Sequence, residues 1–319
     1  MANITAGSFP SNGIDRGALG FLPSDTSMFA AMRVFPVRTT ATTTGSYLTF
    51  TRADQQRINT TGYLSPMGTA DRIEVGATSS SFNCQAKAAR YLVTHVEAKN
   101  AAGTGMYDPR MVHTTTVVSQ VLRIVEDHWA GAYFTTGVWG TDQSAPSTKW
   151  DSADGGDPIG NIGTAINTIA GQLDGGARGL VGVCGGSVWR TLQRHPAFKD
   201  FSGVINAQGT QLATIEKVAM ACGLDNIIVS DAVKNTALDG VTQSNSAIVG
   251  DGFLVVKVAE AFNPMDPTAG ATFVSSPLTP RSYRTEELQT GAFWVEAMVE
   301  YAFAVPFAGG GVFIQDVLT

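Results

Sequence analysis

The chain is poor in charged residues and in cysteine, and each shortage excludes a class of protein. Only 15% of its 319 residues are charged, the net charge is −6, and lysine and arginine form no cluster. We therefore do not expect a protein that grips nucleic acid by neutralising phosphates, since such binding needs concentrated positive charge. Cys84, Cys184 and Cys222 are odd in number and include no CxxC pair, which predicts reduced core residues of an intracellular product.

Long hydrophobic runs are also missing. No stretch approaches 18 consecutive apolar residues, and no charged N-terminal region precedes an apolar run, so we expect neither a membrane span nor a signal peptide. Hydrophobic residues nevertheless make up 44% of the chain, and glycine is frequent, with 35 residues. The length suffices for one large or two ordinary domains. Many turns and an uncharged surface are typical of a protein whose exterior becomes interface.

The sequence contains no coherent set of catalytic or cofactor-binding residues. No strand leads into the glycines of segment 160–163, no Gly-Lys pair occurs, and Ser187 lacks the second flanking glycine of a nucleophile elbow. The histidines have no ligand-type partner at helical spacing. Asp151, Asp154 and Asp157 could hold a hard cation, the alternative being a solvated loop that ends in a helix cap. We predict no catalytic residue, no cofactor and no metal, with a cation at these aspartates left open.

One long helix is the clearest predicted element. Residues 108–134 contain no glycine before Gly131 and no proline after Pro109, and Asp108 can cap the first turn. About 27 residues make a rod roughly 40 Å long, more than twice the usual helix length. An apolar stripe on a helical period predicts that this rod lies across a sheet. The predicted packing residues on the stripe are Met111, Val118, Leu122, Val125 and Trp129.

Other positions of this helix complete the prediction. A second apolar row widens the stripe beyond a coiled-coil seam, and its members are Val117, Val121 and Ile124. Glu126 and Asp127 lie off the stripe. We predict that these two carboxylates form a solvated or interface-paired surface, because adjacent helix positions point in different directions.

The N-terminal 46 residues have the composition of an arm. They are rich in glycine, serine and threonine, with isolated apolar residues between. Such a segment buries little of its own surface, so it is either disordered or extended over another surface. The scattered apolar side chains favour an extended arm, and its predicted anchors are Phe9, Phe21, Phe29 and Phe35.

A second unusual segment follows the arm. About 30 polar residues separate a strand at 47–50 from an apolar strand pattern at 82–98, which is too long for a hairpin turn. We predict a projecting two-stranded loop at about 51–81, in which residues 57–63 could pair with residues 72–75. A disordered insertion is the alternative.

The second half of the chain alternates strands and helices. Strands at 178–185 and 226–232 with helices at 158–173, 186–198 and 213–223 predict a small α/β layer. Further strands are expected near 233–237 and 246–259. Alternation around Phe293, Val295, Ala297 and Val299, followed by VFIQDV, predicts two long antiparallel strands at the C-terminal end.

Taken in order, these segments resemble a known family. From about Tyr47 onward the series includes FNCQAKAARYLVTHVEA, a long helix opened by DPRMV and closed by WAGAYFTTGVWGTD, KWDSADGGDPIGNIGTAI, LVGVCGGSVWRTLQRHPAFKD and ATIEKVAMACGLDNIIVSDAVKNTA. No piece is diagnostic alone. The ordered set resembles the major capsid (coat) proteins of tailed bacteriophages, which have the Hong Kong 97-type fold.

The resemblance implies an α+β Hong Kong 97-type capsid fold. Its implied parts are an N-terminal arm at 1–46, peripheral strands at 47–98 with an extended β-hairpin loop at about 51–81, a peripheral domain at 99–157 with spine helix 108–134, an axial α/β domain at 158–260, and peripheral strands with the C-terminus at 261–319. The extended loop is implied to contact a neighbouring subunit through Arg57, Tyr63, Met67 and Arg72.

The implied function is structural and not enzymatic. Coat proteins of this family assemble with themselves, as pentamers and hexamers, into an icosahedral head that encloses double-stranded DNA without reading its sequence. The implied site of assembly is the host bacterial cytoplasm, and the implied partners are a separate scaffolding protein and a portal, with a decoration protein left open. No lysine lies between Phe50 and Phe82, so the isopeptide cross-link of some relatives is not expected. The alternatives are an encapsulin-type compartment and a soluble α/β enzyme.

Overall fold

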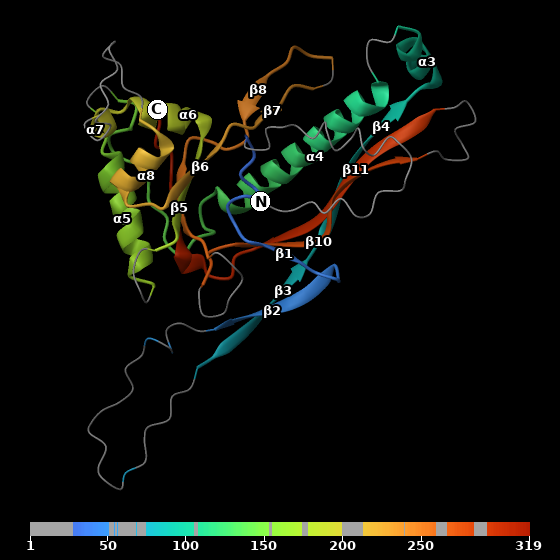
Figure 1. Cartoon of the computed structure of the whole chain (residues 1–319). Helices are drawn as coiled ribbons and strands as arrows, with labels where there is room; N and C mark the ends of the chain where they lie inside the picture. The colour runs from blue at the N-terminus through green and yellow to red at the C-terminus, as the bar shows by residue number, and fades with distance from the viewer. Residues whose placement is uncertain are drawn as a thin grey trace.

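The computed structural model is an α+β protein, as predicted, and its described residues form two four-stranded sheets and two two-stranded ones (Figure 1). The structure describes residues 28–50, 54, 56, 68, 75–104, 108–152, 155–173, 178–199, 213–238, 240–259, 267–283 and 292–319. Within these residues no helix is both long and apolar enough to cross a membrane.

The first sheet has the strand order β1-β10-β11-β4. Its strands are β1 (Val37–Thr39), β10 (Ala271–Tyr283), β11 (Phe293–Ala304) and β4 (Gln85–Val93). β1 runs parallel to β10, and the other neighbours are antiparallel. The predicted alternation in β11 is confirmed, since Phe293, Val295, Ala297 and Val299 are buried while the residues between them are only partly buried. One face of this sheet is therefore available to pack against a helix.

The long helix α4 (Pro109–Tyr133) lies on that face, against β4 and β11 (Figure 1). It begins as predicted, because the Asp108 carboxylate accepts a hydrogen bond from the Arg110 amide at 2.9 Å and Pro109 occupies the first helical position. The predicted strand pattern at 82–98 is wrong at its end. Residues 95–98 open the helix α3 (His95–Thr104), whose first turn is capped when the Thr94 hydroxyl accepts from the Glu97 amide at 3.3 Å.

The second sheet confirms the predicted α/β layer. Its order is β12-β9-β5-β6, with the bounds Gly311–Ile314, Phe253–Lys257, Leu180–Gly185 and Asn226–Ser230. The associated helices are α5 (Pro158–Ala170), α6 (Gly186–Arg194), α7 (Pro196–Lys199) and α8 (Ile215–Cys222). β5 and β6 are parallel, and β9 is antiparallel to β5. Every residue of β9 is buried, which explains its continuous apolar sequence.

The predicted pair of long strands at the C-terminal end is wrong. β11 is long, but its partners are β10 and β4, whereas β12 pairs with β9 in the second sheet. A 3₁₀ turn at Ala308–Gly310 separates β11 from β12. A side chain at Gly311 would come within 2.2 Å of the Trp139 ring, so this crossing needs glycine. The implied assignment of all of 261–319 to peripheral strands therefore fails at β12.

The expected strand at 246–259 also divides between two sheets. Its first part belongs to β8 (Asn245–Ala247), which pairs with β7 (Val233–Asn235) in a separate hairpin. Its last part is β9 of the second sheet. Gly250 and Gly252 lie in the turn between the two strands, where the chain leaves one sheet for the other.

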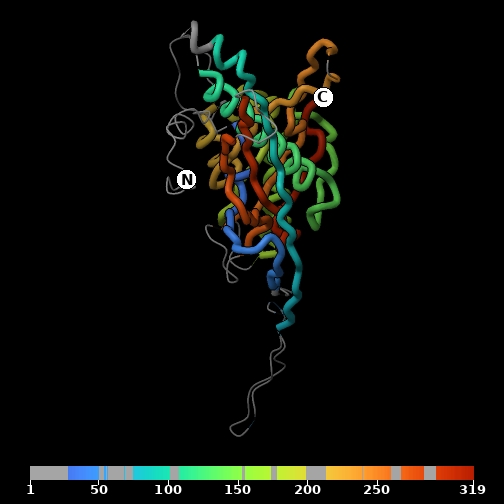
Figure 2. Tube along the Cα trace, turned by 90° about the vertical axis from the view of Figure 1, so that its right-hand side faces the viewer, coloured from blue at the N-terminus to red at the C-terminus, as the bar shows by residue number. Residues whose placement is uncertain are grey.

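A two-stranded ribbon projects from the body of the molecule. β2 (Thr44–Phe50) is antiparallel to β3 (Ala77–Asn83), and the pair extends beyond both sheets in Figure 1. Figure 2 shows the body narrower from the side, with the ribbon still pointing away from it. The base of the ribbon is held where Phe82 stacks on Phe273 of β10, with ring centroids 4.2 Å apart. The predicted pairing of 57–63 with 72–75 lies outside the described residues.

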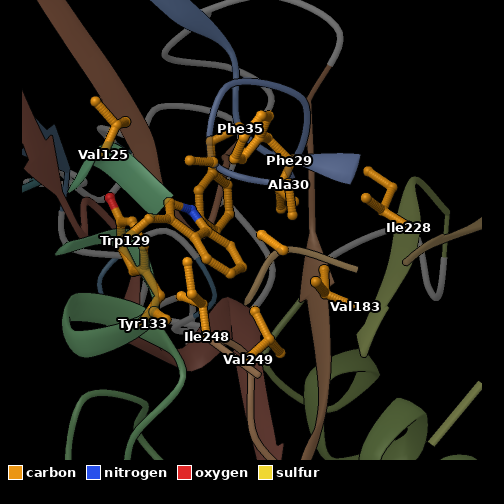
Figure 3. Packing of buried hydrophobic residues seen from close by; sticks show 14 of the residues in the cluster. Phe29, Ala30, Phe35, Val125, Trp129, Tyr133, Val183, Ile228, Ile248 and Val249 are labelled. Atoms are coloured by element: carbon orange, nitrogen blue, oxygen red, sulfur yellow. The ribbon is translucent and has the colours of Figure 1, made fainter. Parts of the chain in front are cut away.

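One hydrophobic cluster joins the two sheets. It contains α4 residues such as Trp129 and Tyr133, first-sheet residues such as Val299, and second-sheet residues such as Val183. Figure 3 shows Phe29, Ala30 and Phe35 of the N-terminal segment in the same packing as Trp129 and Tyr133. The large apolar area removed from water here fixes the two sheets to each other.

Candidate assembly surfaces and the Glu126 junction

The described residues contain no group of three or more His, Cys, Asp or Glu side chains placed to hold a metal ion. The Asp157 carboxylate caps α5 by accepting from the Gly160 amide at 2.8 Å, which is the predicted alternative to a cation. The Asp151 carboxylate accepts a hydrogen bond from the Thr319 hydroxyl at 2.7 Å. Hydrogen bonds from Thr319 lower the pKa of this carboxyl. Asp154 lies outside the described residues.

All three cysteines are free and buried. Burial raises the pKa of Cys222 to about 12 and raises the pKa of Cys184 further. The thiolate is the reactive form, so neither side chain has the character of a nucleophile at neutral pH. Their packing supports the predicted role as core residues.

We expect the Cys184 and Cys222 thiols to be unreactive in the folded chain. At pH 8 an aromatic disulfide reagent should react with Cys184 and Cys222 at least about a hundredfold more slowly than with a free thiol, because burial limits both access and ionisation. In denaturant all three thiols should react at the rate of free cysteine. Rapid modification of either residue in the folded protein would contradict the burial described here.

The structure places the predicted packing residues of the long helix at different depths. Val118, Val125 and Trp129 are fully buried in the cluster that joins the sheets, and Leu122 is partly buried against it. Met111 is half-buried near the start of the helix. The predicted second row is wrong at Ile124, which is 38% exposed and faces the opposite side of the helix.

The predicted anchors of the N-terminal arm divide in the same way. Phe29 and Phe35 are buried in the core of this same chain, whereas Phe9 and Phe21 lie outside the described residues. The Phe35 ring lies 4.8 Å from the Tyr133 ring, and a side chain at Gly270 would come within 2.6 Å of it. Phe29 and Phe35 therefore anchor this part of the segment on other elements of the same chain, whose core they complete.

Glu126 is the residue whose environment the sequence-based prediction got wrong. It is fully buried, not solvated or interface-paired as predicted. Its two oxygens accept hydrogen bonds from the Ala30 amide at 3.0 Å and from the Ala31 amide at 2.8 Å. The Ser230 hydroxyl donates to the same carboxylate at 2.7 Å. One side chain of α4 thus binds the N-terminal segment and the end of β6.

The electrostatics of Glu126 are set by burial. Desolvation raises the pKa of its carboxyl above the ordinary value of 4.5, although the hydrogen bonds from Ser230, Ala30 and Ala31 and the charge of Arg33 oppose this. The next residue behaves differently. Asp127 is exposed and forms an ion pair with Lys234 of β7 at 2.6 Å.

The projecting ribbon presents open strand edges on both of its strands. Within the described residues no third strand pairs with β2 or β3. Leu48 of β2 is 64% exposed, and the residues of β3 are mostly exposed. Unpaired edges of this kind accept strands of another chain. The predicted contact residues Arg57, Tyr63, Met67 and Arg72 lie outside the described residues.

A second open surface lies between α4 and the hairpin β7–β8. The groove is lined by Gln120, Arg123, Ile124, Asp127, Val233, Lys234, Asn235, Gln243 and Asn245. Beyond it, Leu238 and Val241 near the end of the hairpin are 81% and 64% exposed. Large apolar side chains exposed together mark surfaces that other proteins cover.

Two joined sheets, a long helix across one of them and a projecting ribbon define a capsid-type fold. The chain has the Hong Kong 97-type fold of phage capsid proteins, as its similarity to solved structures shows. No family model and no curated protein sequence matches it.

Three of the similar structures illustrate the match. A phage-related protein from Bordetella bronchiseptica RB50 superposes with a TM-score of 0.65 at 18% identity, over 95% of this chain and 96% of that one. The capsid structure of the cyanophage P-SCSP1u has a TM-score of 0.59 at 11% identity, over 98% and 91%. A virus-like particle from Pyrococcus furiosus has a TM-score of 0.55 at 9% identity, over 94% and 96%.

Proposed function

We propose that this chain is the major capsid protein of a tailed bacteriophage, which assembles with itself into an icosahedral head. The observation that carries the proposal is a fold shared over nearly the whole chain with a phage-related protein, a cyanophage capsid and a virus-like particle, at 94 to 98% coverage of this chain. The proposed shell consists of pentamers and hexamers, because icosahedral shells larger than twelve pentamers need both. Open strand edges and exposed apolar residues supply surfaces for such contacts.

We assign the parts of the chain to roles in this shell. The ribbon and the loop it carries, including Arg57, Tyr63, Met67 and Arg72, reach over a neighbouring subunit. The α4 helix and the first sheet form the peripheral part, and the second sheet with its helices forms the axial part around which capsomers close. Residues 1–46 form the N-terminal arm, and the part around Phe29 and Phe35 packs on the core of the same chain. With no lysine in 51–81, cohesion in this shell comes from non-covalent contacts.

The proposed shell encloses double-stranded DNA without sequence-specific contacts. A net charge of −6 suits a wall that does not bind its contents tightly, since strong binding would hinder filling and release. The remaining proposed partners are a separate scaffolding protein and a portal. The buried thiols and the lack of a metal-binding cluster among the described residues favour a structural role over catalysis.

A second candidate is a shell with the same fold that encloses cargo other than phage DNA, as in an encapsulin-type compartment. The similarity to a virus-like particle from Pyrococcus furiosus favours keeping this candidate. It would share the contacts between subunits proposed above and differ in what the inner surface faces.

Negative-stain electron microscopy of the expressed chain, with and without its scaffolding protein, tests the proposal. Closed shells or ring-shaped capsomers are expected. A compact monomer of 33.5 kDa that persists at high concentration under both conditions would overturn both candidates. Particles purified from infected cells should contain nuclease-protected double-stranded DNA, whereas protein cargo without DNA would favour the second candidate.

A further inference from the structure

The groove between α4 and the hairpin β7–β8 has a lining that suits an extended peptide. Ile124 of α4 and Val233 of β7 are 38% and 45% exposed and supply its apolar part. The amide side chains that line the same groove are Gln120, Asn235, Gln243 and Asn245. Amide groups both donate to and accept from a peptide backbone, so this lining can hold an extended chain that also carries apolar side chains.

One charged side chain of the groove lacks a counter-charge. Asp127 and Lys234 form an ion pair with each other at 2.6 Å. Arg123 is partly buried, and within the described ranges no residue forms an ion pair or hydrogen bond with its guanidinium. Taking a guanidinium out of water is costly unless an acidic group pairs with it. The groove therefore favours an occupant with a carboxylate beside Arg123.

The described N-terminal segment begins next to this groove. The Met28 carbonyl accepts hydrogen bonds from the Asp231 amide at 3.2 Å and from the Ser230 hydroxyl at 3.4 Å. Asp231 is two residues before Val233, which lines the groove. Two residues span at most about 7 Å, so the chain that precedes Met28 starts close to the groove.

Asp25 is within reach of Arg123. The Ala30 amide donates to the Glu126 carboxylate at 3.0 Å. Arg123 is three residues before Glu126, which corresponds to about 5 Å along the helix axis. Asp25 is five residues before Ala30, and an extended chain of that length spans up to about 17 Å. The first acidic residue before Met28 can therefore bring its carboxylate to the unpaired guanidinium.

The sequence around Asp25 matches the rest of the groove. Three of the four residues 19–22 are apolar, and Asp25 is the only charged residue in 19–27. Pro23 fixes its own φ and disfavours a helical conformation at Leu22, so this stretch prefers an extended backbone. An extended chain with apolar side chains and one carboxylate complements both the apolar part of the groove and its guanidinium.

We propose that residues 19–27 bind in the groove between α4 and β7–β8 of the same chain. Asp25 pairs with Arg123, and the apolar residues before it cover the exposed apolar part of the groove. The chain's own segment has the advantage over that of another copy, because the short tether to Met28 gives it a high effective concentration. This binding concerns the single subunit and does not depend on the proposed shell.

Hydrogen exchange of the full chain, followed by mass spectrometry, tests this binding through a charge swap. Amides of residues 19–27 should be protected in the native chain. Asp25→Arg and Arg123→Glu should each raise the exchange of these amides about tenfold, because each substitution brings like charges together. The double variant restores an opposite pair and should return exchange to within about threefold of the native rate.

Lys99→Glu is the matched control, because it makes the same charge change at an exposed position of α3 outside the groove. It should leave exchange of residues 19–27 at the native rate, and amides of β5 and β9 should exchange slowly in every variant. Unprotected amides of residues 19–27 in the native chain, or a double variant that exchanges as fast as the single variants, would refute the proposal. If Arg123→Glu does not fold, Asp25→Arg decides alone, and native exchange of residues 19–27 in that variant refutes the proposal.

Cross-linking distinguishes the chain's own segment from that of another copy. The native cysteines are buried, so Ser24→Cys with Gln120→Cys supplies two accessible thiols for a short bismaleimide and keeps the proposed ion pair. A linked monomer is expected, whereas a linked dimer would mean that another copy fills the groove and would overturn the proposal.

Val112→Cys in place of Gln120→Cys is the control for this cross-link. Val112 is exposed, lies outside the groove and is eight residues earlier on α4, about 12 Å along the axis. A segment bound in the groove should link to position 120 at least about tenfold faster than to position 112. Equal rates at the two positions would show an unbound segment and would overturn the proposal.

Discussion

Replacing Trp129 by alanine is expected to lower the free energy of unfolding by about 3–5 kcal/mol, the usual cost of removing a large buried aromatic side chain. Trp129 is 0% exposed and lies in the cluster that joins both sheets to α4. Its ring centroid is 5.8 Å from that of Tyr133 and 6.5 Å from that of Phe35, so the substitution leaves a cavity next to both rings. Urea unfolding followed by circular dichroism measures the change.

Two substitutions on the same helix and at the same site control this result. Ile124→Ala removes an apolar side chain that is 38% exposed and should cost less than about 1 kcal/mol. Trp129→Phe should cost less than the alanine substitution, because it keeps an aromatic ring and removes an indole N–H that has no acceptor among the described residues. An unchanged midpoint for Trp129→Ala would mean that this face of α4 does not carry the core.

Removing the segment that joins the two strands of the ribbon should abolish closed particles and leave the subunit folded. Phe50 and Ala77 are opposite each other in the ladder, so residues 51–76 can be replaced by an Asn-Gly turn that joins the two strands directly. The shortened chain retains both sheets and the contacts of Phe82 and Tyr47 with Phe273. Electron microscopy should show no shells, because the proposed contacts with the neighbouring subunit are missing.

The thermal midpoint of the shortened subunit provides the control for folding. It should lie within a few degrees of that of the native chain, since none of the described residues among those removed belongs to either hydrophobic cluster that includes the sheets. Shells of normal size and yield from this variant would remove the role assigned to the ribbon. A subunit that no longer folds would instead show that residues 51–76 belong to the core.

Local signals in the sequence were enough to predict several helices and strands and part of their packing. The cap at Asp108 and the apolar period of the following helix predicted α4 and its contact with a sheet, because both depend on residues within a few turns. Alternation in β11 predicted which face is buried. The order of segments also predicted the Hong Kong 97-type fold, which the similar structures show.

Long-range partners explain what the sequence could not provide. Glu126 was predicted to be a surface carboxylate because the groups that donate hydrogen bonds to it lie about a hundred residues away along the chain. They are the Ala31 amide and the Ser230 hydroxyl of β6. One signal was present, since Glu126 is four residues after Leu122 and three before Trp129, on the side of the helix that packs. A charged residue between such positions is a candidate for a buried hydrogen-bonded group.

The packing of Phe29 and Phe35 and the sheet that β12 joins were not predicted, for a related reason. Composition identified 1–46 as a segment unable to form a core alone, but it could not show that Phe29 and Phe35 fill a core made by other elements. β12 has the continuous apolar sequence of a buried strand, and nothing in that sequence tells which sheet it joins. The 3₁₀ turn and the close approach of Gly311 to Trp139 decide this, and both are tertiary features.

The central claim is that this chain serves to bind copies of itself, and mass photometry of the purified full chain over a concentration series tests it most directly. The account predicts that masses of five and six subunits, or of closed shells, appear and increase with concentration at the expense of the 33.5 kDa species. A single 33.5 kDa species at every concentration, with scaffolding protein present as well as absent, would contradict it.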